Sequence, residues 1–179
     1  MLKPSARFDI RQSLLESYAV NERINQYLLE NLSDAAWAAD PPGGKGRTIA
    51  AIAAHMHNVR HMWLVASAKG KPLPEKLDPA TVTKKQAMHA LAESAKCCAQ
   101  LLGEALDHPE GKVKGFRPDV VGMFGYLISH DAHHRGQICS LARELGHSLP
   151  KPVSFGMWEW GSRWKECGFE ACPPTSHLL

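Results

Sequence analysis

Apolar residues recur at the spacing of a helix along four long stretches of this chain. The first stretch runs from about residue 7 to 31, and the others from about 48 to 69, 83 to 106 and 119 to 145. Within each stretch, apolar side chains return every three or four positions, which places them on one face of an α-helix. No segment shows the alternation of apolar and polar residues that is typical of strands. The pattern therefore predicts an all-α fold.

Segments rich in proline and glycine separate the predicted helices. The longest, "SDAAWAADPPGGKGR", is followed by Thr48, a suitable N-cap for the second helix. Within it, "PPGGKG" lacks the spacing of a phosphate-binding loop and is interpreted as a linker. Gly146 is suited to end the fourth helix, with Pro150 just beyond. We expect a single domain over residues 1–179, a four-helix bundle with a short C-terminal helical tail.

The tail segment "FGMWEWGSRWKECGF" carries three tryptophans, Trp158, Trp160 and Trp164. Trp160 and Trp164 are one helical turn apart, so they share a face of a short helix. Large aromatic side chains at this spacing are most simply explained as an apolar face that closes over the bundle. We therefore expect the three tryptophans to contribute to core packing rather than to a ligand site.

Charge and composition exclude several classes of function. The net charge is +3, and the densest basic group is "KVKGFR" at residues 112–117. Because neither a basic stripe nor a nucleic-acid-reading motif is present, we expect no nucleic-acid partner. No segment has the length of apolar sequence that a membrane span or a signal peptide needs, so we expect no membrane association and a cytoplasmic location.

The cysteines do not form a recognisable framework. None of the five belongs to a C-x-x-C pair, and their odd number argues against a disulfide-stabilised fold. We interpret them as reduced and mostly buried thiols. They are Cys97, Cys98, Cys139, Cys167 and Cys172.

Two histidines in "ISHDAHHRGQI" form a candidate metal-binding pair. His130 and His134 share one helical stripe with a set of mostly apolar residues (Met123, Tyr126, Leu127, Gln137, Leu141 and Leu145). The other side carries Arg135 and Arg143, so the stripe with the histidines is expected to face the core. Histidines at positions i and i+4 can direct ring nitrogens at a common point, as in known zinc-binding helices.

The second helix offers a third ligand in "AAIAAHMHNVRHMWL". His55 lies on an apolar row with Ala51, Ile52, Val59, Met62 and Ala66, so it is expected to point inward. His57 and His61 fall on another side, together with Arg60. We interpret them, and His133, as solvent-facing or interface residues. The alternative, in which His57 and His61 face the core and complete a four-histidine site, stays open.

Three neutral imidazoles around a tetrahedral ion leave one coordination position for water or a substrate, which is typical of catalytic zinc sites. An ion in such a site can lower the pKa of bound water to about 7 or hold a thiol as its thiolate. No general base is evident, because Asp131 lies off the histidine stripe. Gln137 lies on that stripe and could orient a ligand or simply pack between helices.

The segments "HMHNVRHMW" and "HDAHHRGQI", the latter ahead of "LARELG", resemble the DinB-like superfamily of small metal-binding four-helix proteins. The early segment "ESYAVNERINQYLLENLS" and the tryptophan-rich tail extend the resemblance over nearly the whole chain, and H-x-x-x-H-R-G-Q is its most specific part. The resemblance implies that His55, His130 and His134 hold a divalent metal ion and that the chain forms a homodimer. Imidazole ligands suit zinc, nickel, copper and iron alike, and of these we expect zinc or nickel.

Characterised relatives in that superfamily include enzymes that transfer low-molecular-weight thiols to electrophiles, and thiol-dependent isomerases. The resemblance therefore implies a metal-dependent thiol S-transferase that acts on a small-molecule substrate. Two alternatives stay open. One is a metal-dependent hydrolase, and the other is a non-enzymatic metal-binding stress protein in which the ion braces the bundle.

Overall fold

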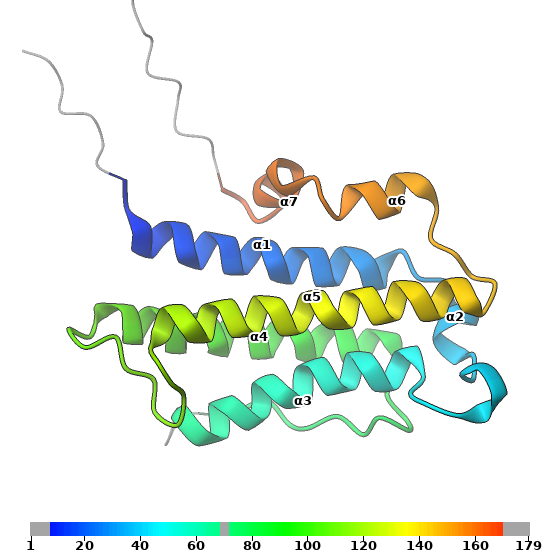
Figure 1. Cartoon of the computed structure of the whole chain (residues 1–179), viewed down its shortest axis with the longest axis horizontal. Coiled ribbons are helices and arrows are strands. Elements are labelled where there is room, and N and C mark those ends of the chain that lie inside the picture. Colours follow the sequence, from blue (N-terminus) through cyan, green and yellow to red (C-terminus); the bar gives the residue numbers. More distant parts are fainter. Residues whose placement is uncertain (1–7, 69–71, 170–179) are drawn as a thin grey trace, which may run out of the picture.

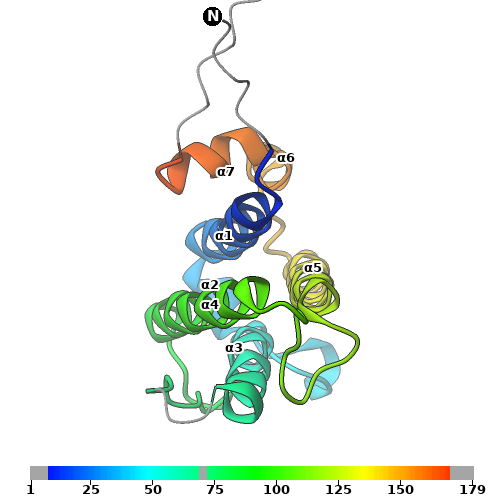
Figure 2. The same ribbon diagram turned by 90° about the vertical axis from the view of Figure 1, so that its left-hand side faces the viewer.

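The computed structural model describes residues 8–68 and 72–169. Its four long helices are α1 (Ile10–Glu30), α3 (Ile49–Ser67), α4 (Lys84–Asp107) and α5 (Val120–Glu144) (Figure 1). Seen along the bundle, α1 and α3 lie diagonally opposite, with α4 and α5 on either side (Figure 2). The described residues contain no strand, so the predicted all-α bundle is confirmed, and each predicted helix lies within a few residues of an observed one.

Side-chain caps explain where the long helices begin. At each start, an Asp or Thr side chain accepts a hydrogen bond from a backbone N–H in the first turn (Asp9, Thr48, Thr83 and Asp119). Gly146 follows the end of α5 with a φ of 79°, a conformation that residues with a Cβ rarely adopt. The expected cap at Thr48 and stop at Gly146 are therefore both confirmed.

Short helices occupy the connections and the tail. The α1–α3 connection contains α2 (Asp34–Ala38) and a 3₁₀ turn at Pro42–Gly44 within the predicted linker. The tail consists of α6 (Lys151–Gly156) and α7 (Trp160–Glu166), which lie on the side of α1 that faces away from α3 (Figure 2). A Cβ on Gly156 would collide with the ring of Tyr27, so glycine permits this close approach.

Of the three tail tryptophans, only Trp164 packs against the bundle as predicted: it is half-buried, and its indole N–H donates to Glu16 of α1. Trp158 is 79% exposed and Trp160 is 41% exposed, whereas Arg163 is the buried residue of α7. Its guanidinium carbon lies 3.9 Å from the centre of the Tyr27 ring, and the Arg163 side chain also forms an ion pair with Glu166. The prediction was wrong for Trp158 and Trp160, because the Tyr27 ring on the outer face of α1 attracts the Arg163 cation, which Glu166 of α7 itself pairs with.

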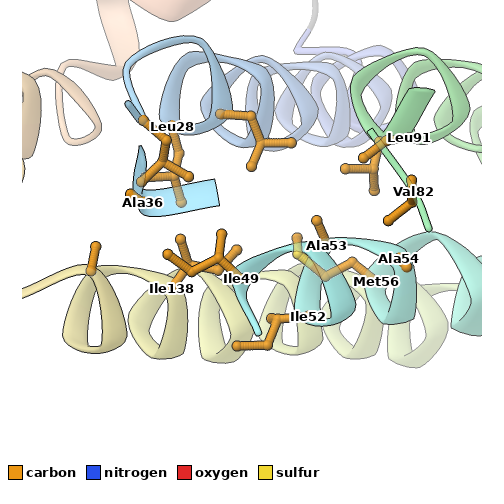
Figure 3. Close-up of a cluster of buried hydrophobic side chains, with 14 residues drawn as sticks. Leu28, Ala36, Ile49, Ile52, Ala53, Ala54, Met56, Val82, Leu91 and Ile138 are labelled. Atoms are coloured by element: carbon orange, nitrogen blue, oxygen red, sulfur yellow. The ribbon is translucent and has the colours of Figure 1, made fainter. Parts of the chain in front are cut away.

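Two apolar clusters fill the ends of the bundle. The first cluster joins α2, the start of α3 and the C-terminal ends of α1 and α5 (Figure 3). Its buried members are Leu28, Leu29, Leu32, Ala36, Ile49, Ile52, Ala53, Ala54, Met56, Val82, Ala87, Leu91, Ile138 and Ala142. The second cluster lies toward the opposite end and is formed by Tyr18, Leu64, Ala68, Ala95, Cys98, Leu101, Leu102, Ala105, Val113, Val120, Met123 and Leu127.

Four of the five cysteines lie in the described part of the chain, and all four are free thiols, as expected. Cys98 is buried, and burial raises the pKa of its thiol to about 11. The other three are only half-buried, which corrects the expectation of mostly buried thiols. Cys172 lies outside the described residues.

None of the helices in the described ranges is long and apolar enough to cross a membrane.

Candidate metal centre

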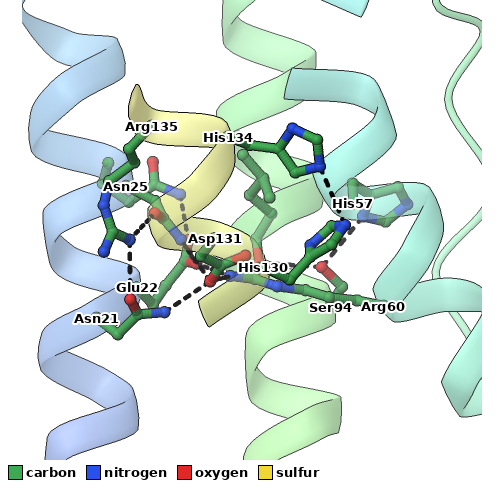
Figure 4. A network of polar contacts seen from close by, with 12 residues as sticks. Asn21, Glu22, Asn25, His57, Arg60, Ser94, His130, Asp131, His134 and Arg135 are labelled. Atoms are coloured by element: carbon green, nitrogen blue, oxygen red, sulfur yellow. Dashed lines mark hydrogen bonds and ion pairs between the residues drawn. The ribbon is translucent and has the colours of Figure 1, made fainter. Parts of the chain in front are cut away.

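A layer of buried polar side chains lies between the two apolar clusters. Figure 4 shows the contacts within this layer. At its centre is Arg60 of α3, only 1% exposed. One terminal nitrogen, Nη2, lies 2.7 Å from Asp131 Oδ2 and 2.7 Å from Glu22 Oε2, and Nη1 donates to the carbonyl oxygen of Leu91 at 2.9 Å. Arg60 thus connects α3 to all three other long helices.

Asp131 is the second centre of this layer. Its Oδ2 accepts hydrogen bonds from Nδ2 of Asn21 at 2.6 Å and of Asn25 at 3.0 Å, in addition to the bond from Arg60. Burial alone would raise the pKa of Asp131, but the charge of Arg60 and the hydrogen bonds outweigh burial, and the pKa is lowered. Arg135 completes the arrangement by donating to the side-chain oxygens of the same two asparagines.

The buried face of α5 is rotated relative to the prediction. Its buried residues are Val120, Met123, Leu127, Asp131, His134, Ile138 and Ala142. With a rotation of 100° per residue around the helix axis, the mean direction of these buried side chains lies roughly 70° from the direction of His130. Asp131, expected off the inward stripe, is therefore buried, and His130 is half-buried at the edge. The rotation follows from the ion pair between Asp131 and Arg60, which the pattern of α5 alone does not contain.

The predicted inward face of α3 is also wrong. Met62 and Ala66 of the expected apolar row are exposed, and His55 is half-buried rather than central. His57, predicted at the surface or an interface, is 0% exposed. Its Nδ1 lies 2.9 Å from the carbonyl oxygen of Ala90, and its Nε2 lies 2.8 Å from that of Glu75. These contacts connect α3 to α4 and to the α3–α4 connection.

The structure nevertheless brings His55, His130 and His134 together. Their candidate ligand nitrogens all lie within 4.8 Å of one another. Nε2 of His130 and Nε2 of His134 are 3.1 Å apart, and the His55 ring centre is 5.4 Å and 4.8 Å from the centres of those two rings. Metal–nitrogen bonds of about 2.0–2.1 Å place neighbouring ligand nitrogens roughly 3.0–3.4 Å apart, so this cluster could hold a divalent ion.

The hydrogen bonds around His134 fit a metal ligand. Gln137 Oε1 lies 2.8 Å from Nδ1 of His134, and Gln137 Nε2 lies 3.0 Å from Nε2 of His133. Because the amide oxygen can only accept, Nδ1 of His134 carries the proton and its Nε2 lone pair faces the cluster. An outer partner that fixes the tautomer in this way is a recurring feature of metal sites. Of the two expected roles for Gln137, orientation is therefore favoured.

All three histidines have lowered pKa values. Burial is the main cause in each, and it lowers the pKa of His130 to about 4, assisted by the neighbouring His134. Burial and the charge of Arg47 lower the pKa of His55. At His134, burial lowers the pKa by more than the hydrogen bond with Gln137 raises it. At neutral pH the three imidazoles are therefore in the uncharged form that binds metal ions.

These shifts predict how cation binding depends on pH. Protons compete with a cation only below the folded-state pKa values, all of which lie below the ordinary 6.5. We expect the affinity for Zn²⁺ to be constant from pH 8 to about 6.5 and to fall steadily at lower pH. Equilibrium competition with a chelator, corrected for protonation of the chelator, measures this profile. A decline already between pH 8 and 7 would contradict the lowered pKa values.

The alternative four-histidine site, which would include His57 and His61, has no support in the structure. Among the described residues, the cluster that could hold a metal ion contains His55, His130 and His134 and neither of these two. His133 is exposed, as expected, and reaches the site only through Gln137. Arg60 and Asp131 were missed because no residue pattern within one helix identifies partners on another.

Comparison with known proteins adds one finding. A family model described as the DinB family matches residues 5–161, a range that contains all three histidines. Neither the curated proteins nor the solved structures gave a significant match.

Proposed function

The chain belongs to the DinB family, and we propose that it is a metal-dependent thiol S-transferase whose divalent ion is held by His55, His130 and His134. The observation that carries the proposal is the convergence of three imidazoles without a fourth His, Cys, Asp or Glu in that cluster among the described residues. Such a ligand set leaves a coordination position for an exogenous ligand. Thiol transfer is favoured because characterised relatives in the DinB-like superfamily use low-molecular-weight thiols.

The surroundings of the histidines support a thiol substrate. A divalent ion would supply Lewis acidity that keeps a bound thiol in its thiolate form near neutral pH. His55 and His130 are only half-buried, so a small molecule can reach them from solvent. Arg47, just before α3, is close enough for its charge to lower the pKa values of His55 and His134. This positive charge attracts an anionic thiol to the same place.

The hydrolase alternative has less support. Hydrolysis at this site needs a base beside the reacting water. Asp131 follows His130 directly in the sequence, but its carboxylate is buried and engaged by Arg60 and two asparagines. It is therefore committed to the polar layer rather than to a substrate.

The role assigned to Arg47 can be tested with two thiols of different charge. We expect Arg47→Gln to raise KM for mercaptoacetate severalfold, with kcat little changed, and to leave KM for uncharged 2-mercaptoethanol near that of the wild type. The effect should shrink as ionic strength rises. Lys45→Gln removes an exposed charge from the same loop and is the matched control. An equal effect on both thiols would exclude electrostatic attraction as the role of Arg47.

Removal of the metal tests the function itself. A chelator should abolish consumption of a thiol by a generic electrophile while helical circular dichroism persists, because the two apolar clusters that hold the helices together include none of the three histidines. The melting temperature should fall, since a ligand that binds only the folded state stabilises it. Parallel loss of helix and metal would instead favour a bracing, non-enzymatic ion. Unchanged thiol consumption by the stripped protein would rule out the proposed activation.

A further inference from the structure

A cavity of about 310 Å³ that is open to solvent lies between α1 and the tail helix α7. Its walls are Ser13, Glu16, Ser17 and Val20 from α1 and Trp160, Gly161 and Trp164 from α7. Because α7 lies on the side of α1 that faces away from α3, this cavity is separate from the histidine cluster (Figure 2). The two indoles are one helical turn apart and therefore line the cavity from the same side.

Glu16 contributes a negative charge to this cavity. Its Oε2 accepts a hydrogen bond from the indole N–H of Trp164 at 2.9 Å, and its Oε1 accepts one from the Gln12 amide at 2.7 Å. Both donors are uncharged, so they hold the carboxylate in place without neutralising it. Within the described ranges, Glu16 forms no ion pair with a lysine or arginine.

A second cavity, of about 380 Å³, adjoins the first and shares Glu16 with it. Asp9, Arg11, Gln12, Leu15 and Phe169 complete its lining. The one basic group there, Arg11, is already paired with Asp107 through two hydrogen bonds of 2.6 Å and 2.9 Å. Among the residues that the structure describes, the Glu16 carboxylate therefore has no free counter-charge in this second cavity either.

We propose that the cavity between α1 and α7 binds a small organic ammonium ion. The faces of tryptophan rings attract cations, and a carboxylate beside them adds a full opposite charge. The volume is at the lower end of the range for small-molecule sites, and the Ser13 and Ser17 hydroxyls can accept hydrogen bonds from a ligand N–H or O–H. The proposal also explains why Trp160 stays 41% exposed on a helix that buries an arginine.

The ligand is an organic cation rather than a metal ion. Among the described residues, the groups that could hold a metal do not include Glu16 or any other residue of this cavity. Indole rings and a single carboxylate provide charge and a polarisable surface, but they do not provide the several oxygen or nitrogen ligands that a metal ion needs.

The test uses choline and methylammonium as probes, with 3,3-dimethylbutan-1-ol as the uncharged isostere of choline. We expect at least one of the two cations to bind the full-length, metal-loaded protein saturably in the millimolar range or tighter, and the alcohol to bind at least about tenfold more weakly. Isothermal titration calorimetry and amide chemical-shift titration measure the affinities for the two cations and for the alcohol. Binding should persist after chelation, because the cavity and the histidine cluster lie on different sides of α1.

Two substitutions should weaken binding of the cation by about tenfold or more. Glu16→Gln removes the charge but keeps an oxygen that can accept from Trp164, and Trp160→Leu removes one indole. Trp158→Leu is the matched control, because Trp158 is 79% exposed and does not line the cavity. Binding of both cations no tighter than that of the uncharged alcohol, no saturable binding of either cation, or unchanged affinity in both cavity variants would overturn the proposal.

Discussion

Replacement of His55, His130 or His134 by alanine is expected to remove most of the bound divalent ion. The nitrogens of these three side chains converge within 4.8 Å, so each variant leaves two imidazoles at most. The loss of affinity should exceed the roughly 10–100-fold that removal of an outer hydrogen-bond partner causes. Elemental analysis of the purified variants, followed by Zn²⁺ competition titrations, measures the change.

His57→Ala is the informative control for this series. Both ring nitrogens of His57 lie within hydrogen-bonding distance of backbone carbonyl oxygens, so the variant should keep wild-type metal stoichiometry but unfold more easily. His133→Ala, at an exposed position, should keep both the metal stoichiometry and the stability of the wild type. Full metal content in His55→Ala, or loss of metal in a folded His57→Ala, would refute the assignment of the three ligands.

Arg60→Met is expected to lower the free energy of unfolding by roughly 3–5 kcal/mol, the usual result of removing one partner from a buried ion pair. The variant leaves the carboxylates of Asp131 and Glu22 near each other in the interior without the guanidinium that they share. Methionine has a similar length and no charge, so little of the effect comes from lost volume. Denaturant unfolding monitored by circular dichroism measures the difference.

Arg11→Met provides the matched control, because it breaks an exposed ion pair with Asp107 and should change stability little.

The pH dependence of the stability difference between wild type and Arg60→Met offers a second check. The lowered pKa of folded Asp131 stabilises the wild type above about pH 3.8, and this contribution is lost as pH falls through the folded pKa. Without Arg60, burial raises that pKa, so the stability difference between wild type and variant should narrow toward pH 4. A constant difference would mean that the Asp131 charge is not involved.

The polar layer and the histidine cluster lie at the same level of the bundle, so the polar layer helps to position the histidines. Asp131 and His134 share the buried face of α5, and Arg60 lies on α3 little more than one turn from His55. The ion pair between Arg60 and Asp131 therefore fixes the rotation and height of α5 against α3. Its hydrogen bonds are directional, so they hold His130 and His134 opposite His55 more strictly than apolar contacts would.

The sequence by itself determined the helices and the main elements of the site. Apolar spacing located the four long helices, because repetition every three to four residues is a property of one helix alone. The capping residues Thr48 and Gly146 were identified for the same reason, since caps act on their own helix. The spacing of His130 and His134 also placed their rings side by side without reference to any other part of the chain.

Only the tertiary structure decided which face of each helix is buried. On α3, alanines occur on several sides, so apolar periodicity carries little information, and Arg60 and His57 are buried because partners on other helices satisfy them. On α5, the same ion pair rotates the buried face toward Asp131. The tail follows the same rule, since α7 turns Arg163 rather than its tryptophans toward Tyr27. A polar group is buried only when another element supplies its hydrogen bonds and countercharge, and no single-helix pattern contains that element.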